Sequence, residues 1–120
     1  MGARRKVLDF MRDFRKACSK GLVTTTDCRK NRDALSQLGI TERQRLEEIS
    51  TLSVNDYCGI ASERVDGEGI CHIFGKEVCG SLVYIKLKLE ERNGVTFARV
   101  VSFHPPEGRM RFPFRRSEDE

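Results

Sequence analysis

The stretch LVYIKLKLEERNGVTFARVVSFH, residues 82–104, decides the fold of this chain. In its first half, apolar residues alternate with a tyrosine and two lysines, which is the pattern of a strand with one buried face. Asn93-Gly94 is a typical turn sequence, and a second strand-like run follows it and ends at His104. The sequence therefore predicts an antiparallel hairpin of two long strands.

The register of the hairpin decides whether His104 lies on the same face as Tyr84. A two-residue turn at Asn93-Gly94 puts polar side chains of the second strand on the apolar face, which is a poor match. A three-residue loop over 92–94 gives that face the apolar residues of the second strand instead. Those residues are Phe97, Val101 and Phe103, with Arg99 as the one misfit. We therefore predict the three-residue loop, which puts Ser102 opposite Tyr84 and His104 diagonally beside it.

The polar face of this hairpin carries groups suited to cutting RNA without a metal ion. That reaction needs a base for the ribose 2′-hydroxyl, an acid for the leaving 5′-oxygen, and cations for the extra charge on the phosphorane. Histidine is the side chain whose unperturbed pKa lies nearest neutrality, so His104 is the first candidate for proton transfer. Tyr84 is the second candidate, as an acid or, where ammonium groups favour its phenolate, as a base.

Candidate cations lie on the same strand and on either side of the hairpin. Lys86 and Lys88 alternate with the apolar residues and share the predicted face of the tyrosine. Lys76 lies just before this strand in a stretch that we expect to be a loop, and we assign it a catalytic role with Lys86. Arg109 and Arg111 follow the histidine and are, with Lys88, candidate RNA-binding residues because cationic side chains hold phosphates.

The same residues have an ordinary structural interpretation. Tyrosine and lysine alternating with valine and isoleucine is typical of any half-exposed strand. His72 has no comparable neighbours in the sequence, so we expect a structural or surface role for it. Asp56-Tyr57 is more typical of a helix cap with a packed aromatic ring than of a site. The residues alone therefore leave a merely solvated face as an alternative.

Size, hydropathy and cysteine pattern limit the class of protein. The chain has 120 residues, of which 38% are hydrophobic and 33% charged, which suits one domain with a single modest core. It has neither an apolar run long enough to span a bilayer nor a signal-peptide core, so we expect a cytoplasmic protein without membrane contact. The five cysteines form no C-x-x-C pair, which predicts reduced, mostly buried thiols and no zinc site. No nucleotide or metal motif occurs, and we expect no cofactor.

The formal net charge of +4 is unevenly distributed. Basic side chains dominate residues 1–20, whereas residues 117–120 are acidic and are expected to form a disordered tail after a single domain over 1–116. A basic domain favours an anionic partner such as nucleic acid, or an acidic protein. For the N-terminal cluster taken alone, a solvated helix face is the simpler interpretation.

Helical spacing of apolar residues precedes the strands. It predicts helices over residues 4–20, 31–38 and 42–50, the last one with a capping box between Thr41 and Gln44. Helices followed by strands indicate an α+β fold in which N-terminal helices pack on one face of a small antiparallel sheet.

Weaker patterns surround the central hairpin. Residues 23–27 suit either a connector or a short edge strand, and residues 60–64 and 70–74 suggest a weak hairpin through Asp66-Gly67. After two prolines, residues 110–114 are expected to form a last short edge segment.

The chain resembles the motility quorum-sensing regulator toxins over residues 7–114. The strings that carry the resemblance are Leu52-Ser53 with Asp56-Tyr57, then Phe74-Gly75-Lys76, then VYIKLK over 83–88, then VSFHP over 101–105. The resemblance implies a RelE-like fold and the toxin half of a bacterial type II toxin–antitoxin module. It further implies an mRNA interferase that cuts single-stranded mRNA and is silenced by a cognate antitoxin protein, with the ribosome as a further candidate partner.

Site residues carry over from this family only in part. Tyr84 matches a functional tyrosine of the family, and His104 stands where the best-known members have a functional lysine. Those members also have a lysine shortly after the Asp-aromatic pair, where this chain has Cys58-Gly59. The functional glutamine of the family has no clear match, and Lys76 is expected to compensate for it. The resemblance therefore implies a divergent branch.

Two alternatives to an enzyme remain open at the level of sequence. The first is a non-catalytic module that binds RNA or an antitoxin through the same basic face, which requires no aligned pair of proton-transfer groups. The second is a DNA-binding helix-turn-helix formed by residues 31–50, which is weaker because Glu42, Glu47 and Glu48 would bring acidic side chains to DNA.

Overall fold

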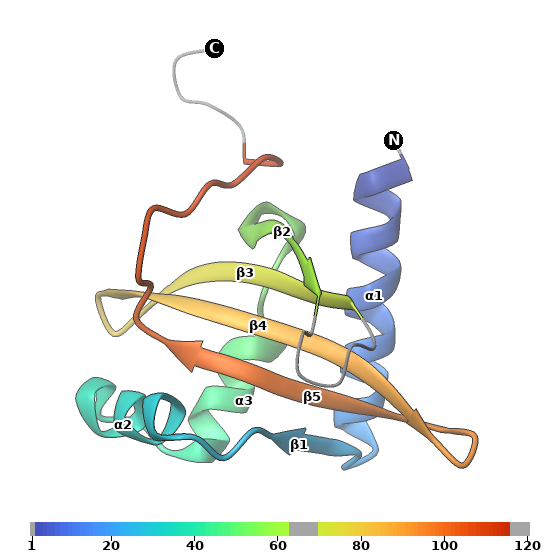
Figure 1. Ribbon diagram of the computed structural model, residues 1–120, viewed down its shortest axis with the longest axis horizontal. Coiled ribbons are helices and arrows are strands. Elements are labelled where there is room, and N and C mark those ends of the chain that lie inside the picture. The colour runs from blue at the N-terminus through green and yellow to red at the C-terminus, as the bar shows by residue number, and fades with distance from the viewer. Residues whose placement is uncertain (1, 63–69, 116–120) are drawn as a thin grey trace.

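Helices come first along the chain, and most of the strands follow (Figure 1). The computed structural model describes residues 2–62 and 70–115. The helices are α1 (Gly2–Ser19), α2 (Arg29–Leu38) and α3 (Glu42–Ser50), followed by the short 3₁₀ helix η1 (Val54–Asp56). The strands are β1 (Val23–Thr25), β2 (Tyr57–Ser62), β3 (Ile70–Val78), β4 (Ser81–Arg92) and β5 (Val95–His104).

Within the described residues, five strands form one sheet in the order β1-β5-β4-β3-β2. α1 and α3 lie behind this sheet in Figure 1, and α2 lies beside the end of β5. The predicted α+β fold is therefore confirmed. The sheet is mixed rather than wholly antiparallel, because residues 23–25 form an edge strand parallel to β5. This settles the alternative between a connector and a strand in favour of the strand.

The core lies between the helices and the sheet. The buried residues of α1 recur at helical spacing and are Val7, Phe10, Met11, Phe14 and Ala17. They belong to one cluster with the buried side chains of the sheet, which include Phe74, Val83, Ile85, Val100 and Phe103. Fully burying one such side chain stabilises the fold by about 1.5–3 kcal/mol. This apolar layer therefore holds α1 against the sheet.

The ends of the shorter helices follow the predicted capping chemistry. α3 starts at a capping box, in which the Thr41 hydroxyl accepts from the Gln44 backbone N–H and the Gln44 side chain accepts from the Thr41 backbone N–H. α2 ends at Gly39, which has φ +72° and thus the left-handed conformation that favours glycine. Ser53 and Asp56 form the corresponding box around η1. The predicted helix over 42–50 is therefore confirmed at both ends.

The turn between β4 and β5 differs from the predicted three-residue loop. Arg92 pairs directly with Val95, so the turn has two residues. Asn93 and Gly94 have φ +53° and +78°, as a type I′ turn requires at both central positions. Asparagine and glycine tolerate this conformation better than other residues, and this preference outweighs the apolar match that favoured the longer loop. The second-strand residues buried near the turn are accordingly Ala98 and Val100, not Phe97 and Val101.

A β-bulge then changes the register between β4 and β5. Leu87 pairs with Val100, but Lys86 pairs with Ser102, so Val101 is an extra residue on β5. Beyond the bulge, Phe103 is buried on the apolar face as predicted. His104 pairs directly with Tyr84 rather than diagonally. Because of the bulge, His104 lies on the predicted face of the sheet even though the turn has two residues.

The chain after β5 forms a C-terminal segment, residues 105–115, in which we expected an edge strand over 110–114. The described part of this segment contains no strand. All three prolines of the protein lie in it, and proline has no backbone N–H to donate to a ladder. The segment instead packs over Gly75, where a Cβ atom would lie 2.8 Å from Phe112 Cζ and 2.9 Å from Met110 Cε.

Several smaller predictions can be compared with the structure. The weak hairpin is confirmed as β2 and β3, whereas its turn at Asp66-Gly67, the domain boundary at 116 and the tail over 117–120 lie outside the described residues.

All five cysteines are free, but only Cys71 is buried, so the expectation of mostly buried thiols is wrong. Cys79 is exposed because it lies in the tight turn between β3 and β4. Among the described helices, none is long and apolar enough to cross a membrane.

Candidate active site

A cleft of about 740 Å³ lies where the end of β5, the middle of β4, the start of α2 and the C-terminal segment meet. The polar and charged side chains that line it include Lys30, Tyr84, Lys86, His104, Arg109 and Arg111. Most of the site residues predicted from the sequence therefore come together in one place. Lys30 was not predicted.

Tyr84 and His104 stack on each other inside this cleft. Their ring centroids are 5.4 Å apart and their planes differ by 27°. Both residues are half-buried, so each ring packs on one side and reaches the cleft on the other. The pair follows from the strand register, because Tyr84 and His104 are direct cross-strand partners.

A backbone contact orients the imidazole of His104. Its Nδ1 lies 2.9 Å from the carbonyl oxygen of Pro105. A carbonyl oxygen only accepts, so we assign the proton of the neutral ring to Nδ1. Nε2 is then the acceptor, and the neutral ring is able to take a proton from a bound hydroxyl group.

The phenol of Tyr84 is suited to donate a proton rather than to accept one. Burial raises the pKa of Tyr84, and the negative charges that Cys71, Cys58 and Glu107 can carry raise it further. The ammonium groups on the same face do not outweigh these effects, so the pKa of Tyr84 rises from its ordinary value of 10.0. Tyr84 therefore remains a phenol at neutral pH and can donate a proton. The alternative that it serves as a phenolate base is not supported.

Positive charge predominates along the walls of the cleft. Lys86 is half-buried, and Arg109 and Arg111 are exposed on the C-terminal segment. Lys30 forms an ion pair with Glu107, which is the acidic residue among the described residues that line the cleft. Hydrogen bonding and charge from Lys30 hold the pKa of Glu107 below its ordinary value. The cleft therefore presents more cations than anions to a ligand, as an RNA phosphate requires.

Lys88 does not belong to this surface, which corrects its predicted RNA-binding role. It lies on the same strand as Tyr84, but it is 3% exposed. Its Nζ lies 3.3 Å from a carboxylate oxygen of Glu90, which also accepts a hydrogen bond from Arg99. Burial raises the pKa of Glu90, but hydrogen bonds and charge from Arg99 and Lys88 outweigh burial and lower it overall. Lys88 therefore neutralises a half-buried carboxylate instead of facing a ligand.

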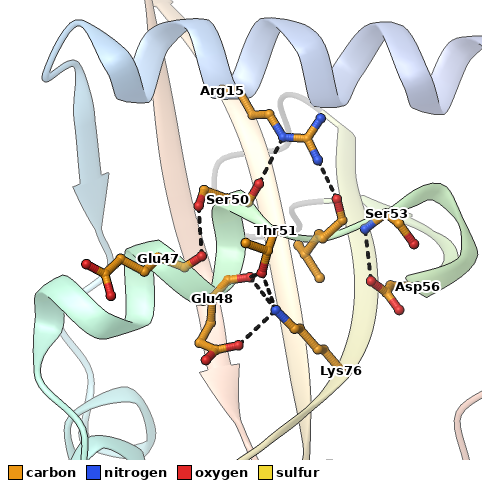
Figure 2. Close-up of polar contacts among 9 residues, drawn as sticks. Arg15, Glu47, Glu48, Ser50, Thr51, Ser53, Asp56 and Lys76 are labelled. Atoms are coloured by element: carbon orange, nitrogen blue, oxygen red, sulfur yellow. Dashed lines mark hydrogen bonds and ion pairs between the residues drawn. The ribbon is translucent and has the colours of Figure 1, made fainter.

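Lys76 also lies elsewhere, which corrects its predicted catalytic role and its expected place in a loop. It belongs to β3 and pairs with Val83, so it is on the face that α3 covers. Its Nζ lies 2.8 Å from Glu48 Oε1 and 3.0 Å from the Glu48 carbonyl oxygen, and it hydrogen-bonds Thr51 (Figure 2). A cation at these carbonyl groups stabilises the C-terminal end of a helix.

Arg15 of α1 supports the same helix end from the other side. Its Nε donates to the Ser50 carbonyl oxygen at 3.1 Å, and its second nitrogen donates to the Leu52 carbonyl oxygen (Figure 2). Arg15 satisfies the carbonyl group of Ser50 at the end of α3 and that of Leu52 just after it. Lys76 adds a cation at the Glu48 carbonyl group, which also accepts from Thr51. Part of the basic character of the sequence therefore serves the fold rather than a ligand.

The two motifs expected to be structural have that role. His72 packs on Phe10 with ring centroids 4.0 Å apart, and burial lowers the pKa of its imidazole. Asp56 caps η1, as expected. Tyr57 packs against Phe114 of the C-terminal segment with ring centroids 5.5 Å apart. Neither motif lines the cleft.

Lys30 and Cys58 are among the lining residues of the cleft that sequence reasoning missed. Lys30 comes from the first turn of α2, and no local pattern shows that this helix start lies beside the end of β5. Cys58 takes the place that follows the Asp-aromatic pair and lines the cleft. Burial raises the pKa of the Cys58 thiol to about 11, so it is not a thiolate at neutral pH.

Comparison of the chain with protein-family models, with curated proteins and with solved structures gives no match. The geometry of the cleft therefore carries the functional argument.

Proposed function

We propose that this protein is a metal-independent endoribonuclease that cuts single-stranded mRNA, and that it acts as the toxin of a type II toxin–antitoxin module. The observation that carries the proposal is the direct stacking of His104 on Tyr84, at 5.4 Å between ring centroids, in a cleft lined by cations. One ring has an acceptor nitrogen, Nε2, and the other keeps its proton at neutral pH. Such a pair supplies the base and the acid that RNA cleavage needs.

In the proposed reaction, His104 Nε2 takes the proton of the ribose 2′-hydroxyl. The 2′-oxygen forms a bond to phosphorus while the bond from phosphorus to the 5′-oxygen breaks, and Tyr84 gives its phenolic proton to the leaving oxygen. The products are a 2′,3′-cyclic phosphate and a 5′-hydroxyl group. Lys86, with Arg109 and Arg111, stabilises the additional negative charge on the phosphorane. The imidazolium then returns a proton to the phenolate, which restores both groups.

The first test replaces one nucleotide of the substrate. A single-stranded RNA with a 2′-deoxy sugar at the cleavage point should resist cutting, because the attacking hydroxyl group is missing. The all-ribose RNA should be cut equally well with and without EDTA. Cutting of the deoxy substrate, or complete inhibition by EDTA, contradicts the mechanism.

The second test replaces the imidazole. The His104→Ala change should lower the cleavage rate by about 10²–10⁴-fold, the usual contribution of one acid–base group. The matched control is His72→Gln, which changes the other of the two histidines, on the opposite face of the sheet. The control should cut at a rate close to that of the unchanged protein at neutral pH. Equal rates for both variants would exclude His104 from catalysis.

A binding module for RNA or an antitoxin is the second candidate function. Two observations favour it: Arg109 and Arg111 are exposed, and the stacked rings of Tyr84 and His104 are only half-buried. Both features suit the binding of a ligand without catalysis. Tight, salt-dependent binding of RNA without any product would support it over the enzyme.

We further propose that the protein acts in the cytoplasm, on free or ribosome-bound mRNA, and that an antitoxin protein silences it. Growth arrest on expression, relieved by changing His104, is the corresponding cellular test.

A further inference from the structure

One buried side chain of α2 contacts the β-bulge that precedes His104. Asn31 is 1% exposed. Its Nδ2 donates to the carbonyl oxygens of Thr26, at 3.0 Å, and Val101, at 3.1 Å. Its Oδ1 accepts from the backbone N–H of Phe103 at 2.9 Å. Both amide protons and the amide oxygen are therefore engaged with backbone.

These contacts occur where β5 loses its neighbouring strand. The pairing of β1 with β5 ends at Thr25 and Val100, and the last backbone contact is from the Thr26 N–H to the Val100 carbonyl oxygen at 2.9 Å. Beyond this point, no strand within the described residues flanks the outer edge of β5. The amide of Asn31 supplies the acceptor and the donor that a continuing strand would supply. It therefore satisfies buried backbone groups that would otherwise lack partners.

The two anchored positions lie on either side of Ser102 and directly before the histidine. Val101 is the extra residue of the bulge, and Phe103 is the residue that the bulge returns to the apolar face. A bulge without such support has an unpaired residue and a locally disrupted ladder. A shift of the register by one residue at this point would move His104 to the other face of the sheet.

We propose that Asn31 is a positioning residue of the candidate active site: its side-chain amide fixes the bulge at Val101 and thereby places the His104 ring on Tyr84. Only an amide of this length provides two donors and one acceptor in a plane. Aspartate keeps the acceptor for Phe103 but has no protons for the two carbonyl groups. The consequence for RNA cleavage rests on the proposed function, but the consequence for the placement of His104 does not.

The test compares Asn31→Asp with Ala34→Gly, in the full-length protein. Ala34 is fully buried on the same helix, so the glycine weakens α2 without removing any of the three hydrogen bonds. NMR reports the His104 ring protons, which the stacked Tyr84 ring shifts, together with the nuclear Overhauser contacts between the two rings. We expect the contacts and the shift to be lost in Asn31→Asp and retained in Ala34→Gly. Retention of both in Asn31→Asp would overturn the proposal.

Kinetics on a single-stranded RNA provide the second measurement. A misplaced catalytic group lowers the rate of the chemical step, so kcat should fall by about 10²-fold in Asn31→Asp while KM changes by less than about threefold. Ala34→Gly should keep kcat at temperatures where it is folded. A purely structural role would lower the amount of folded protein in both variants and leave kcat per folded molecule unchanged, which would also overturn the proposal.

Two further outcomes are distinguishable. If the unchanged protein does not cut RNA, the proposed function fails, but the NMR comparison still decides whether Asn31 places His104. If Asn31→Asp does not fold, Asn31→Ser replaces it, because the shorter serine hydroxyl group is neutral and can keep at most part of the three hydrogen bonds. Asn31→Ser should then show a partial loss of the ring contact and an intermediate kcat. Full contact and full kcat in that variant would count against the proposal.

Discussion

At the scale of single residues, we expect the imidazole of His72 to make the folded protein sensitive to mild acid. Burial against Phe10 lowers the pKa of His72 below its ordinary value of 6.5. Its Nδ1 is buried and has no hydrogen-bond partner among the residues that the structure describes, so a proton there would have no acceptor. The unfolded chain therefore binds this proton more readily than the folded protein does.

The free energy of unfolding should consequently fall as the pH decreases through about 6.5, and this loss should level off below the lowered pKa of the folded state. Urea unfolding between pH 7.5 and pH 5 measures it. In His72→Phe, which keeps a ring on Phe10, the decrease in this range should disappear. An equal decrease in the unchanged protein and in His72→Phe would show that His72 is not the group responsible. Glu90 acts in a separate range, because its lowered pKa makes it lose its stabilising charge only at more acid pH, below about 4.5.

Alternation along β4 was sufficient to predict that Tyr84 and Lys86 share one face of the sheet. His104 also lies on that face as predicted, but only because the bulge compensates for the wrongly predicted turn. The sequence was insufficient for Lys76, which the neighbouring Gly75 made resemble a loop residue. It was also insufficient for Lys88, because burial depends on what packs over a strand, and alternation does not show this. Asn31 left no recognisable pattern, since its three hydrogen-bond partners come from distant parts of the chain.

At the scale of elements, Gly75 leaves the space that the C-terminal segment occupies. A Cβ atom there would approach Phe112 and Met110 to within 3.0 Å, whereas a Cβ atom at Gly59 of β2 would meet nothing within 4 Å. The two glycines therefore form a matched pair for testing how this segment is held.

Gly75→Val should lower the free energy of unfolding by about 1–3 kcal/mol, the usual cost of overpacking. It should also speed tryptic cleavage after Arg109 and Arg111, because the displaced segment becomes accessible. Gly59→Val should change the cleavage rate little. Limited proteolysis with mass spectrometry measures both rates, and equal rates for the two variants would show that the packing on Gly75 does not hold the segment.

The central hairpin shows how far the pattern of a strand pair can be predicted. The pattern of residues 82–104 predicted both strands and the shared face of Tyr84 and His104, but neither the two-residue turn nor the bulge. Two local preferences conflict there: Asn93-Gly94 favours a two-residue turn, and the burial of Phe103 requires the opposite register. The protein satisfies both with one extra residue at Val101. A prediction that assumes one continuous register cannot contain this solution.

At the scale of the whole molecule, the charge of +4 is less informative than its location. Arg109 and Arg111 line the cleft, whereas Arg43 of α3 is equally cationic but lies away from it, with a side chain that is 90% exposed. Changing any one of them to glutamine alters the net charge by the same amount. Differences between these variants therefore measure local contacts rather than total charge.

We expect Arg109→Gln and Arg111→Gln each to lower the salt dependence of RNA binding, with the slope of log K against log salt decreasing in magnitude by about 0.7 per lost phosphate contact. Arg43→Gln should leave the slope unchanged. Fluorescence anisotropy with an uncleavable 2′-O-methyl RNA, over a range of salt concentrations, provides the measurement. The same slope in all three variants would place the RNA elsewhere on the surface.

The parallel pairing of β1 with β5 joins the first of the described strands to the last one. During translation, β1 leaves the ribosome long before β5 and has no neighbouring strand until residues 95–104 have been made. The imidazole at the end of β5 is made at the same stage, as is the bulge that Asn31 holds. If the protein cuts mRNA as proposed, a nascent chain that stops before β5 has neither a complete sheet nor a complete pair of proton-transfer groups. Only a chain that already contains residues 95–104 can then damage the cell that synthesises it.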